Sequence, residues 1–456
     1  MSLLLKPYCI ILAHLIFSCK NICFVSFLLC YLSMYAQIPA DSIQIDYYYP
    51  NKLQYEDAVY KENIRTVLFH VKNQQLTPAI IPLSGELQLE LTFDELGEEV
   101  NYYSYQLVLC DADWTPSSLD SFDYINGFIE QDITRYQFSL NTFQPYTQYQ
   151  LEIPNRNMQI TKSGNYLLKV YRSGDEDDLV LTRRMIVYEN FMRIEGRFSS
   201  PTLTAVLRTH QRLDFSLVHK GLNIVNPMAE LNVVVLQNGR WDNALKNLKP
   251  TFMHVDELIY NFANRNLFEA GNEFRYFDFR SIRYRSERVK RLEEDKEMRE
   301  KHVYLKEDYP RTPEGIRFRI NYTDFNGRYE IGMRDGLFNY LDADYAFVHF
   351  TLPFDEPLRN GNIYLFGGFT DWQIAPRYQL KYDYEQKAYQ ACIYLKQGFY
   401  NYQYVLLEDG DFVPKAEPFE GNYYRTENDY TILVYHRKFG ARYDRLIGIK
   451  TLNSRI

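Results

Sequence analysis

The sequence predicts an all-β protein made of tandem immunoglobulin-like β-sandwich domains. Tyr and Phe number 41 and 30 against 21 Gly and 18 Pro, and aromatic residues fit the pleated, half-buried surface of a strand. Short segments that alternate apolar and polar residues recur along the chain, with turn residues between them. The length of 456 residues points to several domains, because one domain commonly spans about 100–200 residues.

The N-terminal segment predicts export. Residues 8–36 are nearly all apolar, with Lys6 ahead of them and Lys20 interrupting them. Residues 24–37 have the pattern of the apolar part of a signal peptide that runs into a small residue, Ala36. We therefore expect residues 1–36 to be a signal peptide, cleaved before Gln37. The alternative is a retained anchor, since the stretch could span a bilayer of about 30 Å if Lys20 were tolerated.

The cysteines agree with export and give no disulfide framework. Four of the six fall inside the targeting segment, and a lipid anchor on Cys30 is disfavoured by the large Leu29 before it. Cys110 and Cys392 remain in the mature chain, far apart in sequence and each within an apolar alternating run. We expect two buried, unpaired thiols.

The strand pattern divides the mature chain into three domains. The first is expected at 37–188, the second at 189–344, and the third, which resembles a glycogen-binding-type module, at 345–456. A hairpin loop is expected at 173–178. Strands are predicted at 65–71, 87–93, 103–109 and 166–171, then at 213–219, 230–236 and 274–280, and finally at 345–352, 362–366, 388–395, 400–406 and 430–436.

The segment 283–302 is dense in charges of both signs. A mixed charge run is usually a solvated face. The sequence leaves open whether it forms a short helix or an exposed loop.

The sequence contains no legible catalytic site. The net charge of −8 gives no reason to expect a nucleic-acid partner. The seven histidines after residue 36 stand at no HxxxH or HxH spacing, and no GxSxG, HExxH, GxxxxGK[ST] or GxGxxG element occurs. Glycoside hydrolysis by two carboxylates would leave no motif, so it stays an alternative. We predict no catalytic residue, cofactor, metal or small-molecule substrate.

Residues 111–118 form one candidate contact site. Asp111 and Asp113 alternate beside Trp114 after a predicted strand. A cation site is conceivable there, but two carboxylates fall short of the six to eight oxygen ligands that calcium takes. The favoured interpretation is a strand-to-loop turn whose Trp114 packs on the edge of the sandwich.

A second candidate site lies at residues 365–372, which end in Trp372, and at residues 398–404, which include Tyr402 and Tyr404. This block resembles starch- and glycogen-binding sandwich modules, in which flat aromatic faces stack on sugar rings. The same pattern occurs in sandwiches that bind no sugar and whose Trp is in the core, and that interpretation is favoured. Trp372, Tyr402, Tyr404 and Trp114 are the candidate contacts for a ligand or partner.

Several motifs in order resemble the type IX secretion system plug protein family of Bacteroidota. They are residues 109–119, 124–128, 138–142, 146–149, 153–155 and 163–166 for its first domain, and 324–327, 343–352 and 420–428 for the rest. The likeness spans nearly the whole mature chain. The chain departs from the family in its long extension ahead of the signal-like segment, which points to an upstream start codon or an anchor.

The resemblance implies a function. Such a protein would be a non-enzymatic periplasmic protein at the inner face of the outer membrane. It would dock on the large translocon barrel through which folded cargo leaves, occlude its periplasmic mouth and preserve the permeability barrier. The alternative is an envelope polysaccharide-binding protein with an aromatic site around Trp372.

Overall fold

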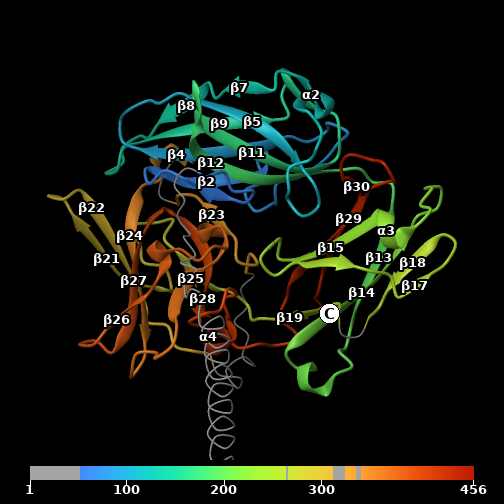
Figure 1. The fold of residues 1–456 in the computed structure, drawn as a ribbon. Coiled ribbons are helices and arrows are strands. Elements are labelled where there is room, and N and C mark those ends of the chain that lie inside the picture. Colours follow the sequence, from blue (N-terminus) through green and yellow to red (C-terminus); the bar gives the residue numbers. More distant parts are fainter. Residues whose placement is uncertain (1–51, 263–264, 312–323, 335–339, 456) are drawn as a thin grey trace, which may run out of the picture. The chain divides into compact units, whose positions relative to one another are not determined.

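The computed structural model describes residues 52–262, 265–311, 324–334 and 340–455. These residues belong to one compact unit that runs from Pro50 to Ile456. The expected signal peptide at 1–36, and the alternative anchor, lie outside the described residues. The all-β prediction is confirmed, because the described chain folds into packed, largely antiparallel sheets that form three β-sandwiches (Figure 1).

The first sandwich lies within residues 58–188. One sheet follows the order β1-β12-β11-β5-β7, with β3 pairing β12 in parallel, and the other follows β2-β4-β9-β8. Apolar side chains of both sheets meet in one core, because alternation turns every second residue inward. The bounds are β1 Ala58–Val59, β2 Ile64–Val71, β3 Ile80–Pro82, β4 Leu89–Leu96, β5 Tyr103–Cys110, α2 Ser121–Tyr124, β6 Ile125–Gly127, β7 Glu130–Asp132, β8 Arg135–Phe138, β9 Tyr146–Ile153, β10 Met158–Ile160, β11 Gly164–Arg172 and β12 Asp175–Tyr188.

The second sandwich combines two distant parts of the chain. One sheet has the order β13-β14-β18-β17, with β19 pairing β14, and the other has the order β16-β15-β29-β30. The bounds are β13 Arg193–Ser199, η1 Thr204–Val206, β14 His210–Val218, α3 Pro227–Glu230, β15 Leu231–Gln237, β16 Leu245–Leu248, β17 Phe252–Met253, β18 Glu257–Tyr260, β19 Leu267–Glu269, β29 Asp429–His436 and β30 Arg445–Asn453.

The third sandwich is formed by the chain between β19 and β29. One sheet has β20, β28 and β23 in order, with β25 also on β28, and the other has the order β21-β22-β24-β27-β26. The bounds are β20 Arg275–Asp278, β21 Val289–Asp295, β22 Glu300–Leu305, β23 Tyr329–Ile331, η3 Tyr340–Asp342, β24 Tyr345–Pro353, β25 Asn362–Phe366, η4 Gly368–Thr370, η5 Pro376–Tyr378, β26 Lys381–Asp383, β27 Ala388–Lys396, β28 Gly398–Leu407 and α4 Glu417–Glu420.

The third sandwich is therefore an insertion in the second. Strand β29 pairs with β15 along its whole length, from Tyr430 opposite Gln237 to His436 opposite Leu231. In Figure 1 the red C-terminal strands accordingly lie beside the green β15. The expected boundary at residue 344 differs from this arrangement, because the third sandwich already begins at β20 and the chain after β28 returns to the second. The expected strand at 430–436 exists, but in the second sandwich.

The charged segment 283–302 is neither the helix nor the loop that its composition left open. Most of it forms the hairpin of β21 and β22, paired from Val289 opposite Leu305 to Asp295 opposite Glu300. Strand β21 is the edge of its sheet, and most of its side chains are exposed. Charged side chains on an edge strand keep other chains from pairing with it, which explains the composition without a helix.

Candidate functional site

A buried ion pair joins the first sandwich to the third. Asp94 of β4 and Lys396 of β27 have no exposed side-chain surface, and Lys396 Nζ lies 2.7 Å from Asp94 Oδ2. The Tyr345 hydroxyl donates to the same oxygen at 2.8 Å, and the Gln148 amide donates to the other at 3.1 Å. Burial lowers the pKa of Lys396, and the attraction of Asp94 opposes that shift. Polar side chains on the outer face of a sandwich thus become the interior of a contact that we call the first–third seam.

A second carboxylate ties loops across the same seam. The Asp344 side chain accepts the backbone N–H groups of Phe143 at 2.8 Å and Gln144 at 3.2 Å. It also pairs with Lys301 Nζ at 2.7 Å. The Tyr146 hydroxyl donates to the Leu341 carbonyl at 3.1 Å. These interactions are buried or partly buried, and together they hold the two sandwiches in one register.

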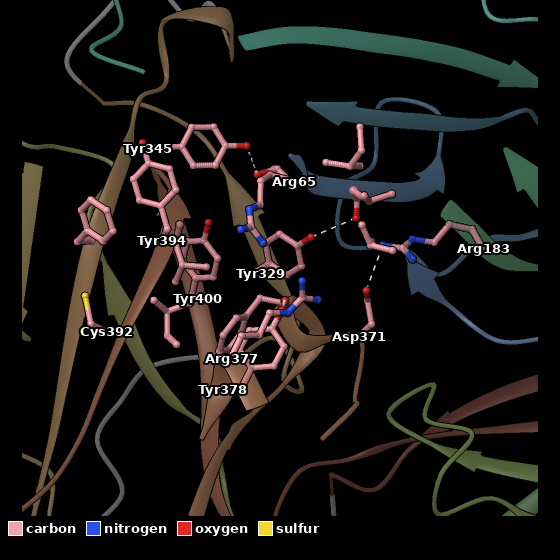
Figure 2. A pocket seen from close by; sticks show the side chains of 18 residues that line it. Arg65, Arg183, Tyr329, Tyr345, Asp371, Arg377, Tyr378, Cys392, Tyr394 and Tyr400 are labelled. Carbon is pink, nitrogen blue, oxygen red and sulfur yellow. Dashed lines mark hydrogen bonds and ion pairs between the residues drawn. The ribbon is translucent and has the colours of Figure 1, made fainter. Parts of the chain in front are cut away.

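A cavity of about 250 Å³ lies in the first–third seam, and Figure 2 shows its lining. The first sandwich contributes Arg65 of β2 and Arg183 of β12, and the third contributes Asp371, Arg377 and a wall of aromatic side chains. Arg183 is buried and pairs with Asp371 at 3.2 Å. The aromatic wall comprises Tyr329, Tyr345, Phe347, Phe369, Tyr378, Tyr394 and Tyr400.

Electrostatics in this cavity follow from burial. Burial raises the pKa of Asp371, although Arg183 opposes the shift. For Arg183 burial works toward a lower pKa, but Asp371 and Asp57 outweigh it and the pKa is raised. Burial also holds the pKa of Tyr400 well above its usual value. The tyrosines are therefore neutral hydroxyl donors at physiological pH, and the fixed charges are those of the arginines and Asp371.

The structure places Tyr402 and Tyr404 in the core of the third sandwich. Both side chains are fully buried. Their hydroxyls donate to one carboxylate oxygen of Asp308, at 2.6 Å from Tyr402 and 2.9 Å from Tyr404. Arg275 pairs with Asp308 at 3.0 Å and with Glu420 at 2.8 Å, which completes a buried polar network. The Tyr-rich strand β28 thus has a packing role and offers no exposed aromatic face to a sugar.

Trp372 lies where the third sandwich meets the second. The Arg240 guanidinium covers its ring at 4.9 Å, and Phe274 and Phe366 pack edge-on against it at 5.8 and 5.4 Å between centroids. A Cβ at Gly327 would stand 2.2 Å from the indole, so only glycine permits this approach. Trp372 is only partly buried, so it packs at the contact between two sandwiches and not in the core of one.

Trp114 lies where the first sandwich meets the second. It is 3% exposed, and Trp241 packs edge-on against it at 5.1 Å between centroids. The Arg184 guanidinium stands 4.5 Å from its ring. Asp111 Oδ1 pairs with Arg437 and accepts the backbone N–H of Asp444 at 3.2 Å, so this oxygen is engaged by the protein. The four candidate contacts from the sequence are therefore split between a core and two seams and do not form one site.

The thiols differ in part from expectation. Cys110 and Cys392 are both free, and Cys110 is buried as expected. Cys392 is exposed, because it occupies an outward position on β27, 3.8 Å from His349 Nε2. Across the described ranges, no three His, Cys, Asp or Glu side chains are arranged to hold a metal ion. Every helix among the described residues is too short or too polar to cross a lipid bilayer.

An apolar row reaches the surface at strand β8. Phe93, Tyr149 and Tyr136 lie side by side across β4, β9 and β8. Phe93 and Tyr149 are buried and stacked at 5.0 Å, whereas Tyr136 is 41% exposed. Two more apolar residues at alternate positions, Phe138 and Leu140, are also exposed. We call Tyr136, Phe138 and Leu140 the β8 edge, because β8 ends its sheet.

Fold and site together define a protein of several β-sandwiches whose buried charged and aromatic residues serve packing within and between the sandwiches. The comparisons identify its family. Residues 64–189 match the type 9 secretion system plug protein 1st domain. The chain belongs to the type IX secretion system plug protein family.

A solved structure extends the likeness over the other domains. The crystal structure of a hypothetical protein from Parabacteroides merdae ATCC 43184 is 34% identical with a TM-score of 0.82, and the alignment covers 88% of this chain and 100% of that one. The N-terminal region of an enterococcal surface protein is too dissimilar to indicate a shared fold. It is 8% identical with a TM-score of 0.19 and covers 89% of this chain and 98% of that one. The same holds for the crystal structure of a trypsin-activated alpha-2-macroglobulin from Escherichia coli, which is 11% identical with a TM-score of 0.16 and covers 87% of this chain and 35% of that one. No curated protein matches.

Sequence reasoning missed Asp94, Lys396, Arg65, Arg183 and Asp371. All five stand in or beside apolar segments. The sequence alone does not distinguish a buried charged residue in such a segment from one that faces solvent. Only the pairing of distant sandwiches gives these charges partners. An inward charge in an otherwise apolar strand, such as Lys396 after the run 388–395, was the one available signal.

Proposed function

We propose that this protein is a non-enzymatic periplasmic plug, which occludes the outer-membrane barrel of the type IX translocon from the periplasmic side and preserves the permeability barrier. The observation that carries the proposal is the match of residues 64–189 to the plug family's first domain. The catalytic motifs sought in the sequence are absent, and a plug needs no chemistry.

The seams support an occluding role. A body that blocks an opening must resist deformation, and sandwiches joined only by linkers would move against one another. Here the first–third seam contains the Asp94–Lys396 pair. The seam between the first and second sandwiches contains Trp114 against Trp241 and a Tyr435 hydroxyl that donates to Asn165 at 2.7 Å. Buried, directional contacts of this kind favour a single arrangement of the three sandwiches.

The β8 edge is the surface that we expect to contact the barrel. It lies within the matched residues, its three side chains are apolar, and one side of its strand pairs with no other strand of the described residues. A partner that supplied an extended segment at the periplasmic rim could pair with β8 and cover Tyr136 and Phe138. Aromatic side chains give large contact area at low entropic cost, which suits such an interface.

Genetic deletion tests the occlusion itself. Removing the protein should make cells sensitive to large antibiotics that an intact outer membrane excludes, and deleting the barrel as well should abolish that sensitivity. The dependence on the barrel is decisive, because a glycan-binding or scaffold protein gives no reason for it. Single-deletion cells that keep a tight outer membrane would overturn the proposal.

Co-purification tests the docking surface. Phe138→Glu places a charge on the β8 edge, and the tagged variant should lose the barrel from its eluate while the wild type retains it. Phe412→Glu is the matched control, since Phe412 is similarly exposed but lies in the third sandwich outside the matched residues. Equal loss in both variants, or in neither, would show that β8 is not the contact.

A further inference from the structure

The cavity in the first–third seam has more positive charge than its own residues neutralise. Its lining includes three guanidinium groups but a single carboxylate, Asp371, which Arg183 already engages at 3.2 Å. Arg65 and Arg377 form no ion pair with any carboxylate among the described residues, and the buried Arg65 Nε has no hydrogen-bond acceptor there. Arg377 is exposed, but leaving a buried donor such as Arg65 Nε without an acceptor is unfavourable.

The tyrosines of the wall offer few hydrogen-bond donors to a ligand, although their hydroxyl oxygens can still accept. Their hydroxyls already donate to groups of the protein, as Figure 2 shows for Tyr329, whose hydroxyl reaches the Val67 carbonyl at 3.2 Å. Tyr378 donates to Phe369 and Tyr400 to Lys396, each through a backbone carbonyl. The wall therefore presents mainly ring surface to the cavity. The donors left for a ligand are those of Arg65 and of Arg377, whose guanidinium also lies 4.8 Å from the Tyr378 ring and interacts with the Tyr378 hydroxyl.

We propose that this cavity binds a small organic anion. Arg65 and Arg377 hold its carboxylate or phosphate group, Arg183 adds positive potential from a buried position, and the aromatic wall covers its apolar body. Guanidinium groups match both anions through paired N–H donors. A volume of about 250 Å³ lies below the range of about 300–1,000 Å³ for drug-sized ligands, so the ligand has the size of a substituted benzene ring.

The cavity communicates with solvent, because Arg377 and Cys392 belong to its lining and are both exposed. Ligand entry therefore requires no opening of the seam. Cys392 also provides a reporter. The other thiol among the described residues, Cys110, is buried, so a neutral alkylating reagent should react with folded protein mainly at Cys392.

The experiment measures how fast iodoacetamide alkylates Cys392 in the mature protein purified from cells. Phenyl phosphate and benzoate are the probes, and benzamide is the neutral counterpart of benzoate. At least one anion should slow alkylation in a saturable way, whereas benzamide should not. Protection by phenyl phosphate alone, or by benzoate alone, assigns the site to that anionic group and supports the proposal.

Arginine variants then tie protection to the cavity. Arg65→Gln and Arg377→Gln should each raise the probe concentration for half-protection by about tenfold, as expected for loss of a charge-assisted contact. Arg359→Gln is the matched control, since this exposed arginine has no ion pair among the described residues and lies outside the cavity. It should leave protection unchanged. If Arg65→Gln does not fold, the exposed Arg377 still provides the test.

Three results would overturn the proposal: no protection by either anion, equal protection by benzamide, or unchanged half-protection in the folded cavity variants. A loss in Arg359→Gln as large as that in the cavity variants would show general attraction by the surface charge and would equally reject the site.

Discussion

Replacing Lys396 by methionine removes the cation of the buried pair in the first–third seam. Methionine keeps most of the apolar stem, so the change isolates the charge. Asp94 would then retain the Tyr345 hydroxyl at 2.8 Å and the Gln148 amide at 3.1 Å, but no positive partner. Breaking a buried pair from one side costs about 3–5 kcal/mol. Because two donors remain, we expect a loss near the lower limit, about 3 kcal/mol.

Urea unfolding followed by tryptophan fluorescence measures this loss. The three tryptophans lie at contacts between sandwiches, Trp114 and Trp241 at one and Trp372 at another, so their emission reports on the seams. The double variant Lys396→Met with Asp94→Leu should recover most of the stability, because it leaves no buried charge unpaired.

The exposed Lys290, paired with Glu307 at 3.2 Å, gives the control Lys290→Met. Its unfolding midpoint should stay at the wild-type value. The reasoning is refuted if Lys396→Met unfolds at the wild-type midpoint, or if the double variant is no more stable than the single one.

Three further predictions concern aromatic side chains. Trp372→Ala should lower the free energy of unfolding by about 3 kcal/mol, measured by urea titration, and the intact protein should not be retained on a glycan column. Tyr402→Phe removes the hydroxyl that donates a hydrogen bond to Asp308 and should lower the free energy of unfolding by about 1.5–3 kcal/mol. The control Tyr384→Phe, at an exposed tyrosine, should not alter the unfolding midpoint. Burial raises the pKa of Tyr105 to about 12, although Asn155 opposes the shift. Stability from Tyr105 is thus fully present below about pH 10, the pKa of an exposed tyrosine, and is lost as the pH rises to 12. Urea unfolding of the wild type and of Tyr105→Phe, each at pH 9 and at pH 12, measures this loss, and a stability difference between the two proteins that does not change with pH would contradict the assignment.

Local pattern located many of the longer strands, although it missed others such as β13 and β30. The predicted strand at 65–71 corresponds to β2, and the one at 345–352 to β24, because alternation reports directly which face is buried. The hairpin loop at 173–178 contains the actual turn, in which Gly174 adopts a positive φ of 87°. Glycine takes up this conformation without the steric cost that a side chain would add.

Partner choice between distant strands was not predictable. Strand β29 is buried along almost its entire length, so its sequence is typical of a central strand. The sequence does not indicate which strands pair with it. Its pairing with β15 joins residues about two hundred positions apart. Chain order suggested that residues 430–436 belong with the strands just before them. The expected third domain therefore extended to the C-terminus, whereas β29 and β30 belong to the second sandwich.

The insertion also explains why the seams matter. The third sandwich joins the second through two chain crossings, one after β19 and one before β29, and both crossings end in the same sandwich. Strand β29 faces the core of the second sandwich with Ile432 and Val434. With its other face, through Leu433 and Tyr435, it packs against Ile186 of the first sandwich. A displacement of the third sandwich would therefore pull on a strand that the first sandwich also holds. Connectivity and packing act together against domain motion, which is the property that an occluding body requires.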